Sequence, residues 1–237
     1  MYKFFIIFLV SIYCSGTLSD IDPYRNLNEK THKFNQDVDQ SIVTPIAKAY
    51  RKVTPDFIEV GVTNFTDNIE DINIALNNFL QGKLNDGFSD LLRFTINSTI
   101  GIFGFFDVAS SAGLEKHSED FGQTLAVWGV KDGPYIVLPG LGPSSLRDTV
   151  SRIPEAFMTP LFLIDHDRTS YELTAIDLLD KRARYLGLET IVVGDDYLFY
   201  RDAYFQSREF EINDGLVEDD FDDFDDFDDF DDLEFDN

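Results

Sequence analysis

Acidic residues are abundant in this 237-residue chain, but it has only 3 histidines and 1 cysteine, and few of its side chains stand at the spacing of a catalytic or metal site. The stretch Asp165, His166 and Asp167 has the composition of a metal ligand set or an acid–base pair, but no second histidine follows at helical spacing. A solvated polar turn is therefore the favoured interpretation. Ser144 and Ser145 follow "LPGLGP" without the G-x-S-x-G pattern of a nucleophile elbow. The sequence thus predicts no catalytic site.

Cofactor and metal signatures are equally weak. Asn35, Asp37 and Asp39 alternate in the manner of cation ligands, yet the rest of that signature is missing from the sequence. No glycine-rich loop of the phosphate-binding type occurs. We therefore expect neither a cofactor nor a metal ion, and we look for binding or transport.

The charge of the chain narrows the possible partners. The formal net charge is −25, and residues 216–237 contain 13 acidic and no basic residues, which leaves −12 for the other 215 residues. Proteins that bind nucleic acids need clustered lysine and arginine to contact phosphates. The sequence has no such cluster, so a role with nucleic acids is disfavoured.

The C-terminal segment, residues 213–237, is predicted to be a disordered acidic tail. A "DDF" repeat runs from Asp219 to Phe230, and so many like charges do not fold on their own. The tail either solvates the protein, or acts as an acidic–aromatic motif for a basic partner or a weak site for divalent cations. It lacks the glycine and terminal glutamate of a calcium-binding helix–loop–helix.

The N-terminus has the pattern of an export signal. A lysine precedes an apolar run of about ten residues, which is too short to cross a bilayer. Residues 1–13 are therefore predicted to be a lipoprotein-type signal peptide, with lipidation at Cys14, the only cysteine of the chain. Tyr13 departs from the small residue expected before a lipidated cysteine. The alternative is an ordinary signal peptide that is cleaved near Ser15 and Gly16.

Apolar residues at helical spacing predict an all-α body. Helices are expected over residues 21–40, over 44–51 with Pro45 in the first turn, over 66–80, over 169–186 and over 196–212. The helix over 66–80 is expected to be capped by Thr66 or Asp67 and to end at Gly82. The residues expected to face inward are Ile69, Ile72, Leu76, Phe79 and Leu80 in the third helix and Tyr171, Ile176, Leu179, Ala183 and Leu186 in the fourth.

Two further segments carry more apolar surface than a water-soluble protein needs. In residues 90–113, the run from Ile100 to Ala109 is apolar around most of a helix, which fits a core helix, an interfacial helix or a re-entrant segment. Residues 134–164 contain two apolar arms, rich in glycine and proline, around a polar turn. Such a hairpin would need a partner in water but could insert shallowly into a membrane.

Several segments, taken together, carry a resemblance to a known family. They are "DPYRNLNEKTHKFNQDVD", "PIAKAY", "VTNFTDNIEDINIALNNFLQG", "RFTINSTIGIFGFFDVAS", "EDFGQTLAVWGVKDGPYIVLPGLGPSSLRD" and "YFQSREFE". In this order, over residues 21–212, they resemble the MlaA/VacJ family of outer-membrane phospholipid-transport lipoproteins of Gram-negative bacteria. The departures are Tyr13 before the cysteine and the "DDF" tail.

The resemblance implies a helical, ring-like domain over residues 21–212 that is associated with the membrane. It implies a lipid-anchored protein on the periplasmic face of the outer membrane, beside a trimeric porin. Phospholipids misplaced in the outer leaflet would pass through an amphipathic channel to a soluble periplasmic lipid-carrier protein. No covalent chemistry would be involved.

The expected channel wall is apolar outside and polar inside, because an unpaired charged headgroup is costly to bury. Each polar candidate for the lipid path has a helix cap or a buried salt bridge as its alternative role. Glycines of the hairpin are hypothesised to let it move. The lipid-path candidates are Asn35, Arg93, Asn97, Asp107, Arg147 and Asp148, and the hinge candidates are Gly129, Gly133, Gly140 and Gly142.

Three classes of function stay open at this point. A passive lipid channel is favoured by the resemblance. A phospholipid hydrolase would need a nucleophile and a base in register, which the sequence does not display. A structural lipoprotein would tether partners through its tail, and deletion of residues 216–237 would abolish its function.

Overall fold

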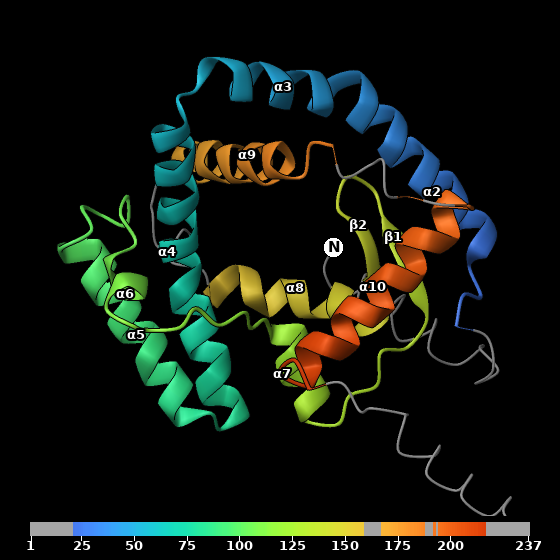
Figure 1. The fold of residues 1–237 in the computed structure, drawn as a ribbon. Coiled ribbons are helices and arrows are strands. Elements are labelled where there is room, and N and C mark those ends of the chain that lie inside the picture. The colour runs from blue at the N-terminus through green and yellow to red at the C-terminus, as the bar shows by residue number, and fades with distance from the viewer. Residues whose placement is uncertain (1–20, 159–166, 188–191, 193, 217–237) are drawn as a thin grey trace, which may run out of the picture.

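The described part of the chain is a ring of helices that includes one small β-hairpin (Figure 1). The structure is a computed structural model, and it describes residues 21–158, 167–187, 192 and 194–216. The predicted all-α, ring-like fold class is confirmed. The elements are α2 (Arg25–Val38), η1 (Asp39–Val43), α3 (Thr44–Val53), α4 (Asp56–Gln81), α5 (Leu84–Thr99), α6 (Val108–Ser111), α7 (Phe121–Val127), β1 (Tyr135–Leu138), β2 (Gly142–Ser145), α8 (Leu146–Met158), α9 (Asp167–Arg184) and α10 (Asp196–Ile212).

Some of the predicted features lie outside the described residues. These are the signal peptide, Cys14, the centre of the Asp165–His166–Asp167 turn, the end of the second apolar arm and the tail from residue 217.

The first part of the ring is one long arc that spans two predicted helices (Figure 1). A π-helical turn, η1, joins α2 to α3 with helical backbone at both junctions. Pro45 stands in the first turn of α3, directly after η1. The helices expected over 21–40 and 44–51 are thus confirmed, and their junction bends without a break.

The prediction for α4 was right about its end and wrong about its start and its buried face. The helix begins at Asp56 after Pro55, ten residues before the expected cap, so neither Thr66 nor Asp67 caps it. Gly82 adopts a left-handed conformation with φ 86° and ends the helix as expected.

The side chains that α4 buries are mostly polar. Asn68, Asn77 and Asn78 are buried, whereas Leu76 and Leu80, expected to face inward, are each 40% exposed. The amides have partners that explain this inversion: Asn78 donates to Asp90 of α5 at 2.8 Å, and Asn68 donates to Ser98 at 2.9 Å. Because polar side chains are satisfied between α4 and α5, Leu76 and Leu80 are free to face outward, whereas Ile69, Ile72 and Phe79 of the predicted stripe are half-buried.

Most of the apolar run after α5 is neither helical nor part of the core, and only its last two residues, Val108 and Ala109, enter α6. Residues 100–107 form a series of turns in which Ile102 and Phe103 have φ near +55°, a region that large side chains seldom adopt. Ile100, Ile102, Phe103 and Phe106 are all more than half exposed. The core interpretation of this run was therefore wrong, and the run forms an apolar knob on the outside of the ring.

The β-hairpin buries its first arm instead of exposing it. β1 pairs antiparallel with β2, with Leu138 opposite Gly142. Tyr135 and Val137 are buried in a small aromatic core against Tyr197 of α10. The expectation that this arm contacts acyl chains was wrong, because alternate residues of β1 face α10; Leu141, at the tip, is 55% exposed.

The last two helices fit the predictions to different degrees. α10 spans Asp196–Ile212, the range expected from the sequence. α9 starts at Asp167 and buries Ala183, but Tyr171 and Ile176 of its predicted inner face are 75% and 44% exposed. Asp180 of α9 is also buried, and it accepts hydrogen bonds from Tyr50 and Thr63 and so ties α9 to α3 and α4.

The described residues are packed with polarity reversed relative to a water-soluble protein. Buried polar and charged side chains outnumber buried hydrophobic ones, and large hydrophobic side chains are exposed on almost every helix. None of the described helices combines the length and the apolar composition needed to cross a bilayer. A large apolar exterior marks a surface that contacts lipid or protein partners.

Candidate functional site: a polar passage inside the ring

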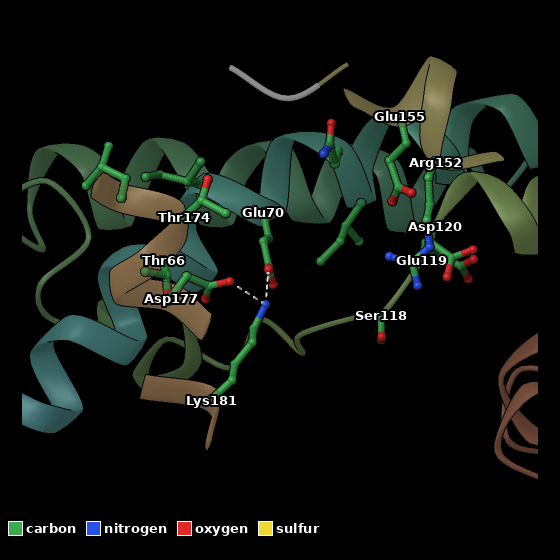
Figure 2. Close-up of a pocket in the computed structure, with 14 residues that line it drawn as sticks. Thr66, Glu70, Ser118, Glu119, Asp120, Arg152, Glu155, Thr174, Asp177 and Lys181 are labelled. Carbon is green, nitrogen blue, oxygen red and sulfur yellow. Dashed lines mark hydrogen bonds and ion pairs between the residues drawn. The ribbon is translucent and has the colours of Figure 1, made fainter. Parts of the chain in front are cut away.

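Two neighbouring pockets in the ring form a polar passage. The first, of ≈ 450 Å³, lies between α4, α8, α9 and the segment before α7 (Figure 2). The second, of ≈ 420 Å³, lies between α7, α8, β2 and α10, and no aliphatic side chain lines it. The pockets share Ser118, Asp120, Arg152 and Glu155, so these four residues form the junction of the passage. Each pocket is within the size range of small-molecule sites.

Lys181, one of the two cations that line the first pocket, is neutralised by two carboxylates. Lys181 of α9 contacts Asp177 at 3.0 Å and Glu70 of α4 at 2.5 Å (Figure 2). Burial opposes the charge of Lys181, but these carboxylates outweigh it and raise the pKa of the ammonium group. The group is therefore a fixed brace between α4 and α9.

Arg208, one of the two cations that line the second pocket, is neutralised by three carboxylates. Arg208 of α10 contacts Asp120 at 2.6 and 3.0 Å, Asp148 at 2.8 Å and Glu211 at 2.8 Å. Burial works against the guanidinium charge, but the hydrogen bonds and charge of Asp120 prevail and raise the pKa of Arg208. This ion cluster joins α7, α8 and α10.

The junction contains a carboxyl group that titrates near neutrality. Burial raises the pKa of Glu155 to about 7, and the nearby charge of Asp120 adds to the rise. The charge at the centre of the passage thus depends on pH in the physiological range.

Of the predicted lipid-path residues, only Asp148 lines one of the described pockets, and its neighbour Arg147 lines neither. Asp148 lines the second pocket and accepts a hydrogen bond from Tyr204 of α10 at 2.6 Å. Arg147 is buried and contacts Asp148 at 3.0 Å and Asp132 at 2.6 Å. Both residues have protein partners that hold α8 in place, so they shape the passage.

Three other candidates form a separate node between α4, α5 and α6. Arg93 is 2% exposed and contacts Ser110, the carbonyl of Leu114 and Asp107. Asn97 donates to Asp107 and accepts from the backbone of Ala109. Although burial opposes it, hydrogen bonding by Ser110 and Asn97 lowers the pKa of Asp107 to about 2. None of the three lines either described pocket, and their contacts are those of a cap and a buried ion cluster.

Asn35 and the predicted hinge glycines shape the hairpin and its approach. Asn35 donates to the carbonyl of Leu138 at 2.9 Å and accepts from the N–H of Gly140 at 2.7 Å, which fixes the tip to α2. All four hinge candidates, Gly129, Gly133, Gly140 and Gly142, have positive φ between 71° and 88°, which glycine adopts at little cost. Their assignment as hinges stays a prediction.

The four residues of the junction, Ser118, Asp120, Arg152 and Glu155, were not predicted from the sequence. Asp148, Ser151, Arg152 and Glu155 occur at spacings i, i+3, i+4 and i+7 and line one pocket from one face of α8. That polar stripe was present in the sequence, but the segment was interpreted as a turn because Pro154 interrupts it. Ser118 and Asp120 belong to a loop and carried no periodic signal.

A helical ring with exposed apolar side chains and pockets lined mainly by polar ones has the surface of a protein that contacts lipid or protein partners. The family model of the MlaA lipoprotein matches residues 20–211. The chain belongs to the MlaA lipoprotein family, which confirms the resemblance found in the sequence.

Named relatives and one solved structure agree with this assignment. The intermembrane phospholipid transport system lipoprotein MlaA of Escherichia coli is 34% identical over 215 residues, which cover 87% of this chain and 85% of that protein. An uncharacterized protein of Rickettsia typhi is 36% identical over 202 residues, with 84% and 80% covered. A chain from a study of the "Structural basis for maintenance of bacterial outer membrane lipid asymmetry" superimposes with a TM-score of 0.74 at 32% identity, covering 81% of this chain and 99% of that one.

Proposed function

We propose that this chain is a passive phospholipid channel that serves the lipid asymmetry of a Gram-negative outer membrane. Misplaced phospholipids of the outer leaflet would enter the ring and leave toward the periplasm. The observation that carries the proposal is the polar passage enclosed by a ring whose exterior is apolar. The names of the relatives agree with it.

The two surfaces match the two parts of a phospholipid. A charged phosphate buried without partners costs several kcal/mol, so a headgroup needs a route lined by polar side chains and water. Acyl chains lose little by staying in hydrocarbon. The passage supplies the polar route for the headgroup. Exposed side chains such as Leu91, Phe103 and Ile153 supply contacts for the acyl chains. Transfer would break no covalent bond.

The apolar exterior also supports a position within a lipid leaflet. The ring would lie in the inner leaflet, on the periplasmic face of the outer membrane. An acylated Cys14 would anchor the chain there, and the exposed apolar side chains of the ring would add contacts with the acyl chains of the leaflet.

Two protein partners belong to the proposal. A trimeric porin would cover part of the apolar exterior that lipid does not cover. A soluble periplasmic lipid carrier would accept the phospholipid, and the acidic body, at −12 without its last 22 residues, suits a carrier with basic patches. That contact should weaken as the salt concentration rises.

Blocking the passage tests the proposal. Ser118 lines both pockets and is exposed, so Ser118→Trp should fill the junction without disturbing a buried contact. Glu115→Trp, three residues earlier on the same loop and outside both pockets, is the matched control. The measurement is the amount of phosphatidylethanolamine in the outer leaflet, labelled by an impermeant amine reagent, in cells whose only family member is this chain.

Ser118→Trp should raise surface phosphatidylethanolamine to the level of cells without the protein, and Glu115→Trp should keep it low. Equal, low labelling with both variants, at equal protein levels, would contradict a route through the passage. Deletion of residues 216–237 distinguishes a tether: a tether loses its function, whereas a channel keeps most of it.

A further inference from the structure

The passage contains a third cation, Arg152, whose situation differs from that of Lys181 and Arg208. It stands on α8 at the junction and lines both pockets. Figure 2 shows Arg152 and Glu155 on the side of Asp120 and Ser118, apart from the group formed by Lys181, Glu70 and Asp177. Its side chain is accessible from the passage, since the residue is exposed.

Within the described residues, Arg152 makes neither a hydrogen bond nor an ion pair. Arg152 lines both pockets, and its guanidinium group has five N–H donors to offer to a ligand there. Lys181 and Arg208, by contrast, each have two or more carboxylates within 3.0 Å. An arginine that is left unpaired in a cavity is available to a ligand.

The acidic residues around the junction are already occupied by other cations. Glu70 and Asp177 pair with Lys181, Asp120 pairs with Arg208, and Glu119 pairs with Lys83 at 2.8 Å. Glu155, which has a partner of its own, is a further carboxyl near the junction and attracts Arg152 electrostatically. Its pKa of about 7 leaves it partly protonated at neutral pH, so it neutralises the arginine only in part and can itself donate a hydrogen bond.

We propose that the guanidinium group of Arg152 binds the phosphate of a phospholipid headgroup at the junction of the two pockets. This inference rests on the proposed function and assigns the ligand contact within it. A guanidinium group pairs with phosphate oxygens through two parallel hydrogen bonds, which a neutral side chain cannot do. Because the site supplies one cation and is open to water, the headgroup is held briefly and can move on.

Binding of short-chain lipids measures this contact directly. The full chain, held in amphipol, is titrated by calorimetry with dihexanoylphosphatidylglycerol, with dihexanoylglycerol, which lacks the phosphate, and with inorganic phosphate. The variants are Arg152→Gln, Arg152→Lys and, as a control of equal charge change outside the pockets, Lys33→Gln on the exposed face of α2. Circular dichroism checks that each variant is folded.

Arg152→Gln should weaken binding of dihexanoylphosphatidylglycerol by about tenfold to a hundredfold, the range for a hydrogen bond to a charged group. Arg152→Lys should weaken it less, since the charge remains. Lys33→Gln should leave it unchanged, and the affinity for dihexanoylglycerol should not respond to any of the three substitutions. Inorganic phosphate should bind far more weakly than the lipid.

Two outcomes would overturn the inference without touching the proposed function. One is equal affinity of Arg152→Gln and the unaltered chain for the phospholipid. The other is inorganic phosphate binding at Arg152 as tightly as the lipid, which would make the site one for free phosphate. If the unaltered chain bound no phospholipid at all, the proposed function itself would fail.

Discussion

At the scale of single residues, Glu155 links the stability of the ring to pH. Its pKa rises from the ordinary 4.5 to about 7 on folding, because of burial first and Asp120 second. Between these two values the folded protein holds a proton that the unfolded chain has lost, so stability falls as the pH rises through this window. The charges of Glu70, Arg152 and Arg208 also act on the group and enter the same balance.

Replacing Glu155 by glutamine should remove this dependence. Glu155→Gln should be more stable than the unaltered chain at pH 8 by about 1–2 kcal/mol, a figure reduced for partial exposure, and nearly equal to it at pH 4.5. Urea unfolding at the two pH values, followed by circular dichroism, measures the difference. If Glu155→Gln raised the free energy of unfolding by the same amount at both pH values, the titration of Glu155 would not be the cause of the difference.

Arg93 tests whether the node between α4, α5 and α6 is structural. It lies 3.8 Å from Asp71, a distance too long for a hydrogen bond, and burial raises the pKa of Asp71 to about 7 against the pull of Arg93. Arg93→Met leaves Asp71 and Asp107 without their cation and should cost about 3–5 kcal/mol at pH 8.

The loss should be smaller at pH 6, where Asp71 can take up a proton. Adding Asp71→Asn to Arg93→Met should recover part of the stability, again measured by urea unfolding. A single variant that unfolds within 1 kcal/mol of the unaltered chain would contradict the structural role and return Arg93 to the lipid path.

At the scale of elements, α3 has the composition of a helix that lies at a membrane surface. Its inner edge is held by Ala47, which is buried, and by Tyr50, which donates to Asp180. The three cations, Lys48, Arg51 and Lys52, share one exposed flank at spacings i, i+3 and i+4. The opposite flank carries Ile46 and Val53, which are 51% and 77% exposed. In an acidic chain, this local basic flank suits anionic headgroups.

The two flanks predict two different responses to vesicles. Changing all three cations to glutamine should weaken binding to vesicles that contain phosphatidylglycerol, by about 1 kcal/mol per cation, and leave binding to phosphatidylcholine vesicles unchanged. Changing Ile46 and Val53 to serine should weaken binding to both. Vesicle flotation provides the measurement, and 0.5 M salt should erase the first effect only. If the glutamine variant also bound phosphatidylcholine vesicles more weakly, the basic flank of α3 would not act through charge alone, and the division of α3 into two flanks would be refuted.

The β-hairpin depends on α2 for its position. The side chain of Asn35 forms hydrogen bonds with backbone groups of Leu138 and Gly140 at the tip of the hairpin. The side chain of Asn28 does the same for Tyr135 and Val137 on β1. Asn35→Ala should therefore speed amide hydrogen exchange over residues 138–142 at least tenfold while the helices exchange as before. Unchanged exchange at the tip would mean that the strand pairing alone holds it.

The elements that could be predicted from sequence were those with clear periodicity and clear ends, and the predicted faces were less reliable. α10 and the end of α4 at Gly82 were predicted correctly. The faces of α4 and α9 were predicted from the rule that apolar residues point inward, and Leu76 and Tyr171, which are 40% and 75% exposed, do not follow it. Residues such as Asn78 and Asp180 find their partners on other elements, and such partners cannot be read from local spacing.

At the scale of the whole molecule, the ring places polar side chains at its interfaces and passage and apolar ones outside. Within the described residues, ion pairs of Arg208 join α7, α8 and α10, an ion pair of Lys181 joins α4 and α9, and hydrogen bonds to Asp180 join α3, α4 and α9. Buried ion clusters give geometry more than stability. Such a frame keeps a hydrated passage open, where an apolar core would close it.

The most direct test of the account asks whether phospholipid occupies the passage. A photoreactive benzoyl-phenylalanine is placed at position 207, where Ser207 lines the second pocket, or at position 203, where Ala203 is exposed on the same helix outside both pockets. After illumination of intact cells, mass spectrometry identifies the lipid attached at each position. The account predicts diacyl phospholipid attached at 207, and less of it when Ser118→Trp fills the junction. Attachment at 203 alone, or at 207 regardless of Ser118→Trp, would contradict a lipid route through the ring.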